Sequence, residues 1–82
     1  MKLRFSDEFL DDFTKIKDNA LKLRIMKHLR KLESLPESGK PLQHNLKGYR
    51  SVRVPPFRII YRIEKDTLFV NFFDHRKDVY KT

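Results

Sequence analysis

The sequence lacks cysteine altogether and contains only two glycines. Without cysteine, disulfide scaffolds, thiolate zinc sites and cysteine nucleophiles are excluded. There is also no apolar run long enough to cross a bilayer, and the N-terminus lacks the apolar core of a signal peptide. We therefore expect a cytoplasmic protein without a membrane partner. The chain has 82 residues and no repeat, linker or low-complexity tract, which predicts a single domain over residues 1–82.

Basic residues are what the sequence has in excess. It carries 19 Lys and Arg against 11 Asp and Glu, a net charge of +8, with a pI near 10.0. A small domain this basic binds a polyanion or is neutralised by an acidic partner, and composition leaves open a merely cationic surface on an ordinary domain. The composition is otherwise globular, with 39% hydrophobic and 12% aromatic residues. A chain this short buries only about 60% of its unfolded surface, which leaves room for a partner to complete its core.

The N-terminal half predicts a short strand and two helices. Residues 1–5 alternate between polar and apolar side chains, as a strand does. Ser6 is a suitable cap for a first helix, Asp18 and Asn19 can cap a second, and Pro36 ends it. Apolar residues recur at helical spacing in both segments. They are Phe9, Leu10, Phe13 and Ile16 in the first and Leu21, Ile25, Leu29, Leu32 and Leu35 in the second. The two helices are expected to form a hairpin with one shared apolar face.

The C-terminal half predicts strands. Residues 37–48 have the composition of a loop, and residues 49–54, 57–63 and 67–73 read as three strands. Pro55-Pro56 and Lys65-Asp66 mark the turns between them. The expected fold class is α+β: a short N-terminal strand, an α-helical hairpin and an antiparallel three-stranded meander packed on the helices.

The turn at Pro55-Pro56 sets the register of the first two strands and places Arg53 opposite Arg58. One face of the meander should then be covered by the helices. It would carry Val52, Val54, Phe57, Ile59, Tyr61, Ile63, Leu68, Val70 and Phe72. The other, here called the open face, would carry Tyr49, Ser51, Arg53, Arg58, Ile60, Arg62, Phe69, Asn71 and Phe73, with Phe73 beside Arg58.

The open face points to an anion-binding site. Like charges directly across two strands are destabilising, so clustered arginines favour a functional explanation. Aromatic rings among the cations suit single-stranded nucleic acid, whose phosphates pair with arginine and whose bases stack on rings. The alternative is a solvated sheet face, with the phenylalanines under the C-terminal tail. Among the tail residues, Arg76 can bind a phosphate, His75 can transfer a proton, and Tyr80 can stack or donate a hydrogen bond. No acidic or cysteine ligands are patterned around the histidines, so neither a metal nor a cofactor is expected.

Three segments resemble the RelE/ParE superfamily of type II toxin–antitoxin toxins: LKGYRSVRV at 46–54, FRIIYRI at 57–63 and HRKDVY at 75–80. The resemblance extends over nearly the whole chain and favours the RelE branch. It implies a toxin. Members of the RelE branch are similar in fold to small microbial ribonucleases and cleave mRNA in the ribosomal A site. The resemblance also implies a cognate antitoxin, RelB-like and with an acidic binding segment. The ParE branch shares the fold and inhibits DNA gyrase instead.

The resemblance also implies roles for particular residues. Arg58 matches the family arginine that contacts the scissile phosphate, Arg76 one assigned to phosphate or leaving-group chemistry, and Tyr80 the tyrosine that orients the substrate. Arg53 and Ser51 fall where relatives carry lysines, and arginine is not readily a base. The predicted catalytic set is Arg53, Arg58, His75, Arg76 and Tyr80, and the predicted RNA contacts are Lys47, Arg50, Arg62 and Phe73.

These observations predict a ribosome-dependent, metal-independent mRNA endoribonuclease toxin whose partners are an antitoxin, the ribosome and mRNA. The arginines supply charge stabilisation amply, whereas proton-transfer groups are few, so weak cleavage of free RNA is expected. A ParE-like gyrase inhibitor, an inactive toxin homologue and a non-catalytic nucleic-acid-binding module remain open. Binding of a membrane surface by the basic second helix is disfavoured, because the apolar side of that helix is needed for the core.

Overall fold

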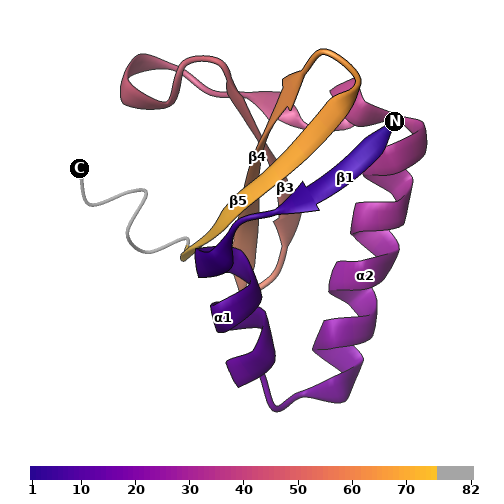
Figure 1. Cartoon of the computed structure of the whole chain (residues 1–82). Helices are drawn as coiled ribbons and strands as arrows, with labels where there is room; N and C mark the ends of the chain where they lie inside the picture. The colour runs from indigo at the N-terminus through magenta and orange to yellow at the C-terminus, as the bar shows by residue number, and fades with distance from the viewer. Residues whose placement is uncertain (76–82) are drawn as a thin grey trace.

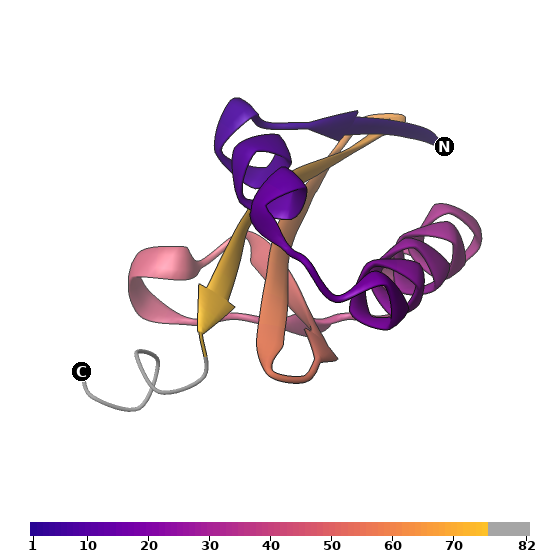
Figure 2. The same ribbon diagram turned by 90° about the horizontal axis from the view of Figure 1, so that it is seen from below.

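In the computed structural model, residues 1–74 are described in full, together with the backbone of His75. Two helices lie on one face of a mixed sheet (Figures 1 and 2). The helices are α1 (Asp7–Lys15) and α2 (Asn19–Ser34), with short 3₁₀ turns at Pro36–Ser38 and His44–Leu46. The strands are β1 (Lys2–Phe5), β2 (Lys40–Pro41), β3 (Tyr49–Val54), β4 (Phe57–Glu64) and β5 (Thr67–His75). The predicted α+β class is confirmed.

The sheet has five strands in the order β1-β5-β4-β3-β2. The predicted meander is its centre, with β3, β4 and β5 antiparallel to their neighbours. Two features were not predicted. The N-terminal strand β1 pairs with β5 in parallel, and Lys40 and Pro41 form the edge strand β2 beside β3 within the predicted loop.

Both helices begin at the predicted caps. The backbone N–H of Phe9 donates to the Ser6 hydroxyl at 3.0 Å, and those of Ala20 and Leu21 donate to the Asp18 carboxylate. Such caps satisfy amide groups that have no partner within the helix. Helix α2 ends at Ser34, two residues before Pro36.

The core lies between the helices and the sheet. Its buried residues are Phe9, Leu21, Ile25, Leu29 and Leu32 from the helices and Val54, Ile59, Tyr61, Leu68 and Val70 from the sheet. Leu10 and Leu35 were expected in the apolar stripes but are 45% and 56% exposed. Leu10 stands one residue off the α1 stripe, and Leu35 follows the end of α2, where the chain turns toward Pro36.

A bulge in β5 reverses the predicted order of two phenylalanines. Tyr61 pairs with Val70 and Ile60 with Phe72, so Asn71 is an extra residue in β5. The start of α1 is anchored there: the Ser6 backbone N–H donates to the Val70 carbonyl at 3.0 Å, and the Ser6 hydroxyl donates to the Asn71 carbonyl. Beyond the bulge every side chain of β5 changes face.

The prediction that Phe73 lies on the open face beside Arg58 is therefore wrong. Phe73 pairs with Ile59 and packs against the core, with its ring centre 4.5 Å from that of Phe9. Phe72, expected in the core, takes the place on the open face instead, as the partner of Ile60.

Candidate functional site

Three cross-strand rows of side chains make up the centre of the open face. The first row joins Arg53, Arg58 and Asp74, because Arg58 is the register partner of Arg53 on one side and of Asp74 on the other. Arg53 is exposed and Arg58 is half-buried. Two guanidinium groups directly across a strand pair repel each other and do not stabilise the sheet. An anion between them would remove that repulsion, so this row is the strongest candidate for a phosphate site.

The second row contains no charged side chain and is largely buried, and we call it the closed row. Ser51 pairs with Ile60 and Ile60 with Phe72, and the exposed fractions of Ser51 and Ile60 are only 5% and 1%. Ile60 was expected on the open face, where an apolar side chain would be available to a partner. Because it is buried, it offers no such surface. Ser51 is likewise too deeply buried to present its hydroxyl freely.

The third row alternates aromatic and basic side chains. Tyr49 pairs with Arg62, Arg62 with Phe69, and Phe69 with Arg4 of β1. The guanidinium carbon of Arg62 lies 4.7 Å from the centre of the Phe69 ring, a cation–π contact. Arg62 therefore lies on the predicted face, four positions along β4 from Arg58.

Arg50 is separated from this face. It pairs with Tyr61, whose side chain belongs to the core, and its guanidinium donates to the carbonyls of Glu37 at 3.1 Å and Gly39 at 2.9 Å. These bonds tie the segment after α2 to β3. The structure thus gives Arg50 a role in holding a loop, on the side of the sheet away from Arg62.

The remaining predicted residues lie near the ends of the strands or outside the described part. Lys47 is exposed in the loop that leads into β3. The backbone of His75 pairs with Phe57 at the end of β5. Arg76 and Tyr80 lie outside the described residues, so their predicted roles stay predictions.

Three residues of the open face were missed by the sequence interpretation: Asp74, Phe72 and Arg4. Asp74 and Phe72 were missed because the bulge at Asn71 changes the face on which they lie. Arg4 was missed because strand alternation alone does not reveal that β1 joins the sheet beside Phe69. Its alternating pattern was a signal for a strand, but the partner strand was not deducible from it.

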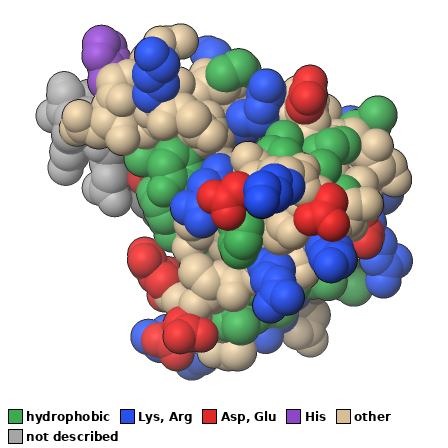
Figure 3. Space-filling view, turned by 45° about the horizontal axis from the view of Figure 1, so that its top comes forward, with side chains coloured by type: hydrophobic (Ala, Val, Ile, Leu, Met, Phe, Trp, Pro, Cys, Tyr) green, Lys and Arg blue, Asp and Glu red, His purple; other side chains and the backbone are tan. Residues whose placement is uncertain are grey.

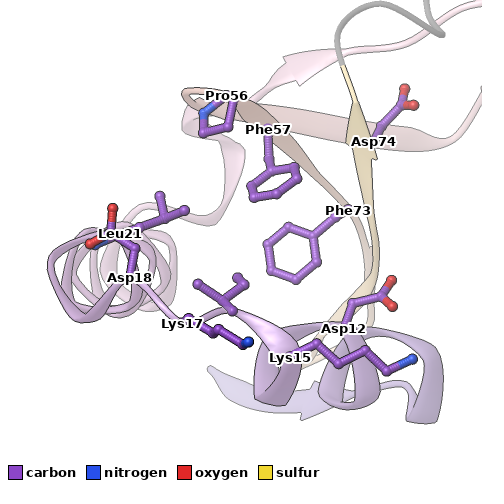
Figure 4. A pocket seen from close by; sticks show the side chains of 10 residues that line it. Asp12, Lys15, Lys17, Asp18, Leu21, Pro56, Phe57, Phe73 and Asp74 are labelled. Carbon is purple, nitrogen blue, oxygen red and sulfur yellow. The ribbon is translucent and has the colours of Figure 1, made fainter.

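A pocket of about 530 Å³ lies between the helices and one end of the sheet (Figure 4). The rings of Phe57 and Phe73 project into it, and Asp12, Lys15 and Asp18 lie around it. Its lining is half apolar and half charged, and the charged residues include Asp74 of the arginine row. The pocket therefore meets the arginine row at Asp74, at the end of β5.

The described surface carries charged side chains of both signs (Figure 3). Figure 3 shows basic side chains distributed over the visible face, with acidic and hydrophobic ones among them. Burial raises the pKa of the Tyr61 phenol, which belongs to the core and not to the open face. Within residues 1–74 there is no group of three or more potential metal ligands. No helix in the same range is long and apolar enough to cross a membrane.

The model of a family described as "ParE toxin of type II toxin-antitoxin system, parDE" matches residues 3–80. The chain belongs to this toxin family. Among solved structures, the toxin is similar to a YoeB/ParE toxin from Agrobacterium tumefaciens, with 25% identity and a TM-score of 0.80 over 93% of this chain and 99% of that one. No curated protein sequence matches it.

Two further solved relatives are toxin–antitoxin complexes. The RelBE2 complex from Mycobacterium tuberculosis contains a chain 28% identical to this toxin, with a TM-score of 0.80 over 92% of this chain and 96% of that one. The YoeB-YefM complex from Staphylococcus aureus has 17% identity and a TM-score of 0.78 over 93% and 97% of the two chains, which shows the fold alone. The family match over residues 3–80, with the relatives at 25% and 28% identity, confirms the predicted superfamily.

Proposed function

We propose that this toxin is a ribosome-dependent mRNA endoribonuclease that is silenced by a cognate antitoxin. The observation that carries the proposal is the cross-strand pair of Arg53 and Arg58 on the open face, flanked by Asp74. A sheet gains no stability from two facing arginines. The planar fork of each guanidinium is suited to a phosphate, to which it donates two parallel hydrogen bonds.

The proposed reaction uses the RNA's own nucleophile. The 2′-hydroxyl attacks the adjacent phosphorus while the 5′-oxygen leaves, which yields a 2′,3′-cyclic phosphate and a new 5′-hydroxyl end. Negative charge grows on the phosphate oxygens as the phosphorane forms. Arg53 and Arg58 are proposed to stabilise that charge, a contribution that commonly amounts to about 100- to 1,000-fold in rate for one positioned donor.

Proton transfer is the weaker part of the proposed site. Arginine does not readily give up a proton, so neither Arg53 nor Arg58 serves as a base. The candidates are the predicted groups His75 and Tyr80, together with the Asp74 carboxylate beside Arg58. General acid–base catalysis is worth roughly 100- to 10,000-fold. A site with few such groups depends on another body, the ribosome, to position the RNA for in-line attack.

The proposed partner is an acidic antitoxin. The chain carries a net charge of +8 and a basic open face, so an antitoxin segment that covers it should be acidic. The solved relatives RelBE2 and YoeB-YefM are complexes of toxin with antitoxin, which supports the same arrangement here.

A second candidate function is inhibition of DNA gyrase without catalysis. The matching family is described by the ParE toxin of parDE, the branch that the resemblance associates with gyrase. Such a toxin needs no proton-transfer groups, which agrees with Arg53 and Ser51 at the positions of family lysines. It does not account for two arginines facing each other with a carboxylate beside them.

The two functions are separated by assaying one preparation in two tubes. In a translation reaction, the proposed ribonuclease produces new mRNA 5′ ends that require ribosomes. In a supercoiling reaction with purified gyrase, it leaves the enzyme active. New ends in the first tube and full supercoiling in the second support the proposal, and the reverse pattern supports the gyrase inhibitor.

A further inference from the structure

The guanidinium of Arg62 lies over the Phe69 ring on the open face. The distance from its guanidinium carbon to the ring centre is 4.7 Å. Its side chain remains 35% exposed. The guanidinium is thus held beside the ring while the side chain stays partly open to solvent. It is pre-organised for a planar partner, so little entropy is lost when one binds.

This arginine is not accounted for by stability. Its Nε is buried and has no hydrogen-bond partner among the described residues, which is a cost to folding. Its nearest carboxylate, Glu64, lies 3.9 Å away and is 61% exposed, and exposed pairs of this kind contribute little. A leucine or valine at this position would avoid the unsatisfied Nε.

The contact is part of a longer row across four strands. Tyr49 of β3, Arg62 of β4, Phe69 of β5 and Arg4 of β1 are consecutive register partners. Aromatic and basic side chains thus alternate across the sheet, here called the stacking row. Alternating rings and cations are what unstacked bases and their phosphates require, because bases stack on rings and on arginine planes.

The stacking row is separated from the Arg53–Arg58 pair by the closed row of Ser51, Ile60 and Phe72. Along β4, Arg58 and Arg62 are four residues apart, which is about 13 Å in an extended strand. Adjacent stacked bases are only about 3.4 Å apart. A single strand with only one nucleotide between those bound at the two rows must therefore be extended, with a base unstacked from its neighbours at the second row.

We propose that the stacking row, centred on Arg62 and Phe69, is a base-stacking subsite for single-stranded RNA beside the phosphate site. The inference rests on the proposed function and adds to it a place that holds a flanking base. Because stacking on a ring and a guanidinium plane is tolerant of sequence, the subsite contributes affinity and extension of the strand rather than recognition of one base.

The test compares the binding of two oligonucleotides to the purified toxin. One is a hexamer of 2′-O-methyl adenosine, which lacks the free 2′-hydroxyl needed for cleavage. The other is the same hexamer with all six bases removed, which keeps only sugars and phosphates. Wild type, Phe69→Leu and Arg62→Lys are titrated with each. Phe69→Leu keeps an apolar side chain and removes the ring, and Arg62→Lys keeps the charge and removes the plane.

Loss of one stacked base lowers affinity by about 5- to 150-fold in single-strand binding proteins. Phe69→Leu is expected to weaken binding of the adenosine hexamer by at least about fivefold and to leave the abasic hexamer unchanged. Arg62→Lys is expected to act in the same direction. Arg24→Lys, on the exposed side of α2, is the matched control and is expected to change neither.

The proposal is overturned if Phe69→Leu and Arg62→Lys weaken both hexamers equally, or neither. Thermal unfolding of each variant identifies one that has failed to fold, in which case the other variant decides. Failure of the proposed function is a separate result. If the wild-type toxin cuts no mRNA on ribosomes but the two variants bind only the adenosine hexamer more weakly, the base-stacking subsite is supported and the ribonuclease function is contradicted. If the wild-type toxin cuts mRNA on ribosomes and the variants show no such base-dependent loss, the ribonuclease function is supported and the subsite is contradicted.

Discussion

Arg53 and Arg58 are direct cross-strand partners on the sheet face that the helices leave uncovered. Arg53 is exposed and Arg58 half-buried, and Asp74 is the next residue across the sheet from Arg58. This placement concentrates positive charge where a protein without an anionic ligand would avoid it. It makes the pair the centre of the proposed phosphate site.

Replacing Arg58 should abolish activity and spare the fold. Arg58→Ala removes the guanidinium proposed to contact the scissile phosphate, with an expected loss of roughly 100- to 1,000-fold in cleavage rate. Because the side chain lies on the open face and outside the core, the variant should fold, with a change in the free energy of unfolding of no more than about 1 kcal/mol. Growth arrest and denaturant unfolding measure the two effects. Arg24→Ala, an equal loss of charge on α2, serves as the control, and a toxic Arg58→Ala variant would contradict the assignment.

Replacing Arg53 should separate stability from activity. Arg53→Gln removes one of two facing charges, so the free energy of unfolding should rise by about 0.2–1 kcal/mol at low salt. That gain should shrink in high salt, where the repulsion is screened. The cleavage rate should fall at the same time. Urea titrations at two salt concentrations measure the stability, and a variant less stable than wild type at both would show that the pair is not under repulsion.

The hydroxyl of Tyr61 should stabilise the loop after α2. It donates to the Pro36 carbonyl at 2.8 Å and accepts from the Gly39 backbone N–H at 3.0 Å. Tyr61→Phe leaves both groups without this partner, with an expected cost of about 1–3 kcal/mol. Activity per folded molecule should be unchanged, because Tyr61 lies on the core side of the sheet.

The contribution of Tyr61 should also depend on pH. Burial raises the pKa of its phenol above the ordinary value of 10.0, so the folded state holds the proton more tightly than the unfolded chain does. The resulting stability is fully present below pH 10.0 and is lost as the pH rises through the folded-state pKa. The difference in unfolding free energy between wild type and Tyr61→Phe should therefore be constant at neutral pH and shrink above that value. A difference that grows with alkaline pH would contradict the sign.

Gly39 should be coupled to the same tyrosine. A Cβ at Gly39 would lie 2.3 Å from the Tyr61 hydroxyl oxygen, whereas one at Gly48 meets no atom within 4 Å. Gly39→Ala and Tyr61→Phe disturb one contact, so their costs should be non-additive by about 0.5–3 kcal/mol in a double-mutant cycle. Gly48→Ala, whose cost arises from its φ of +97°, should be additive with Tyr61→Phe. Additivity in both cycles would show that Gly39 is not constrained by the tyrosine.

The two phenylalanines beyond the bulge should differ in their effect on stability. Phe73 stacks 4.5 Å from Phe9 in the core, so Phe73→Ala should cost about 3 kcal/mol of unfolding free energy. Phe72→Ala, on the open face, should cost roughly half as much or less. Thermal unfolding of the two variants measures this. The opposite ranking would indicate that β5 has no bulge, with Phe72 in the core and Phe73 on the open face.

Local signals in the sequence were sufficient for most of the fold. Ser6 and Asp18 cap the helices as predicted, and the turn at Pro55-Pro56 set the register that brings Arg53 to Arg58. Strand β2 escaped detection because two residues, one of them Pro41, show no periodicity.

The bulge could not be predicted, because it depends on a contact between residues far apart in the chain. The Ser6 hydroxyl donates to the Asn71 carbonyl, and the two residues are 65 positions apart in the sequence. No local pattern around Asn71 predicts this contact. The error on Phe73 follows directly, and so does the omission of Asp74. Likewise, Arg62 was placed by strand alternation, but its stacking on Phe69 required the register of β4 against β5.

The most direct test of the central claim is to map new mRNA 5′ ends in a cell-free translation reaction, with wild type and with Arg58→Ala. We predict ends at codon-phased positions that appear only when ribosomes are present and disappear with the Arg58→Ala variant. Wild-type protein that is folded, yet creates no new ends while it inhibits gyrase supercoiling in a parallel reaction, would contradict the account.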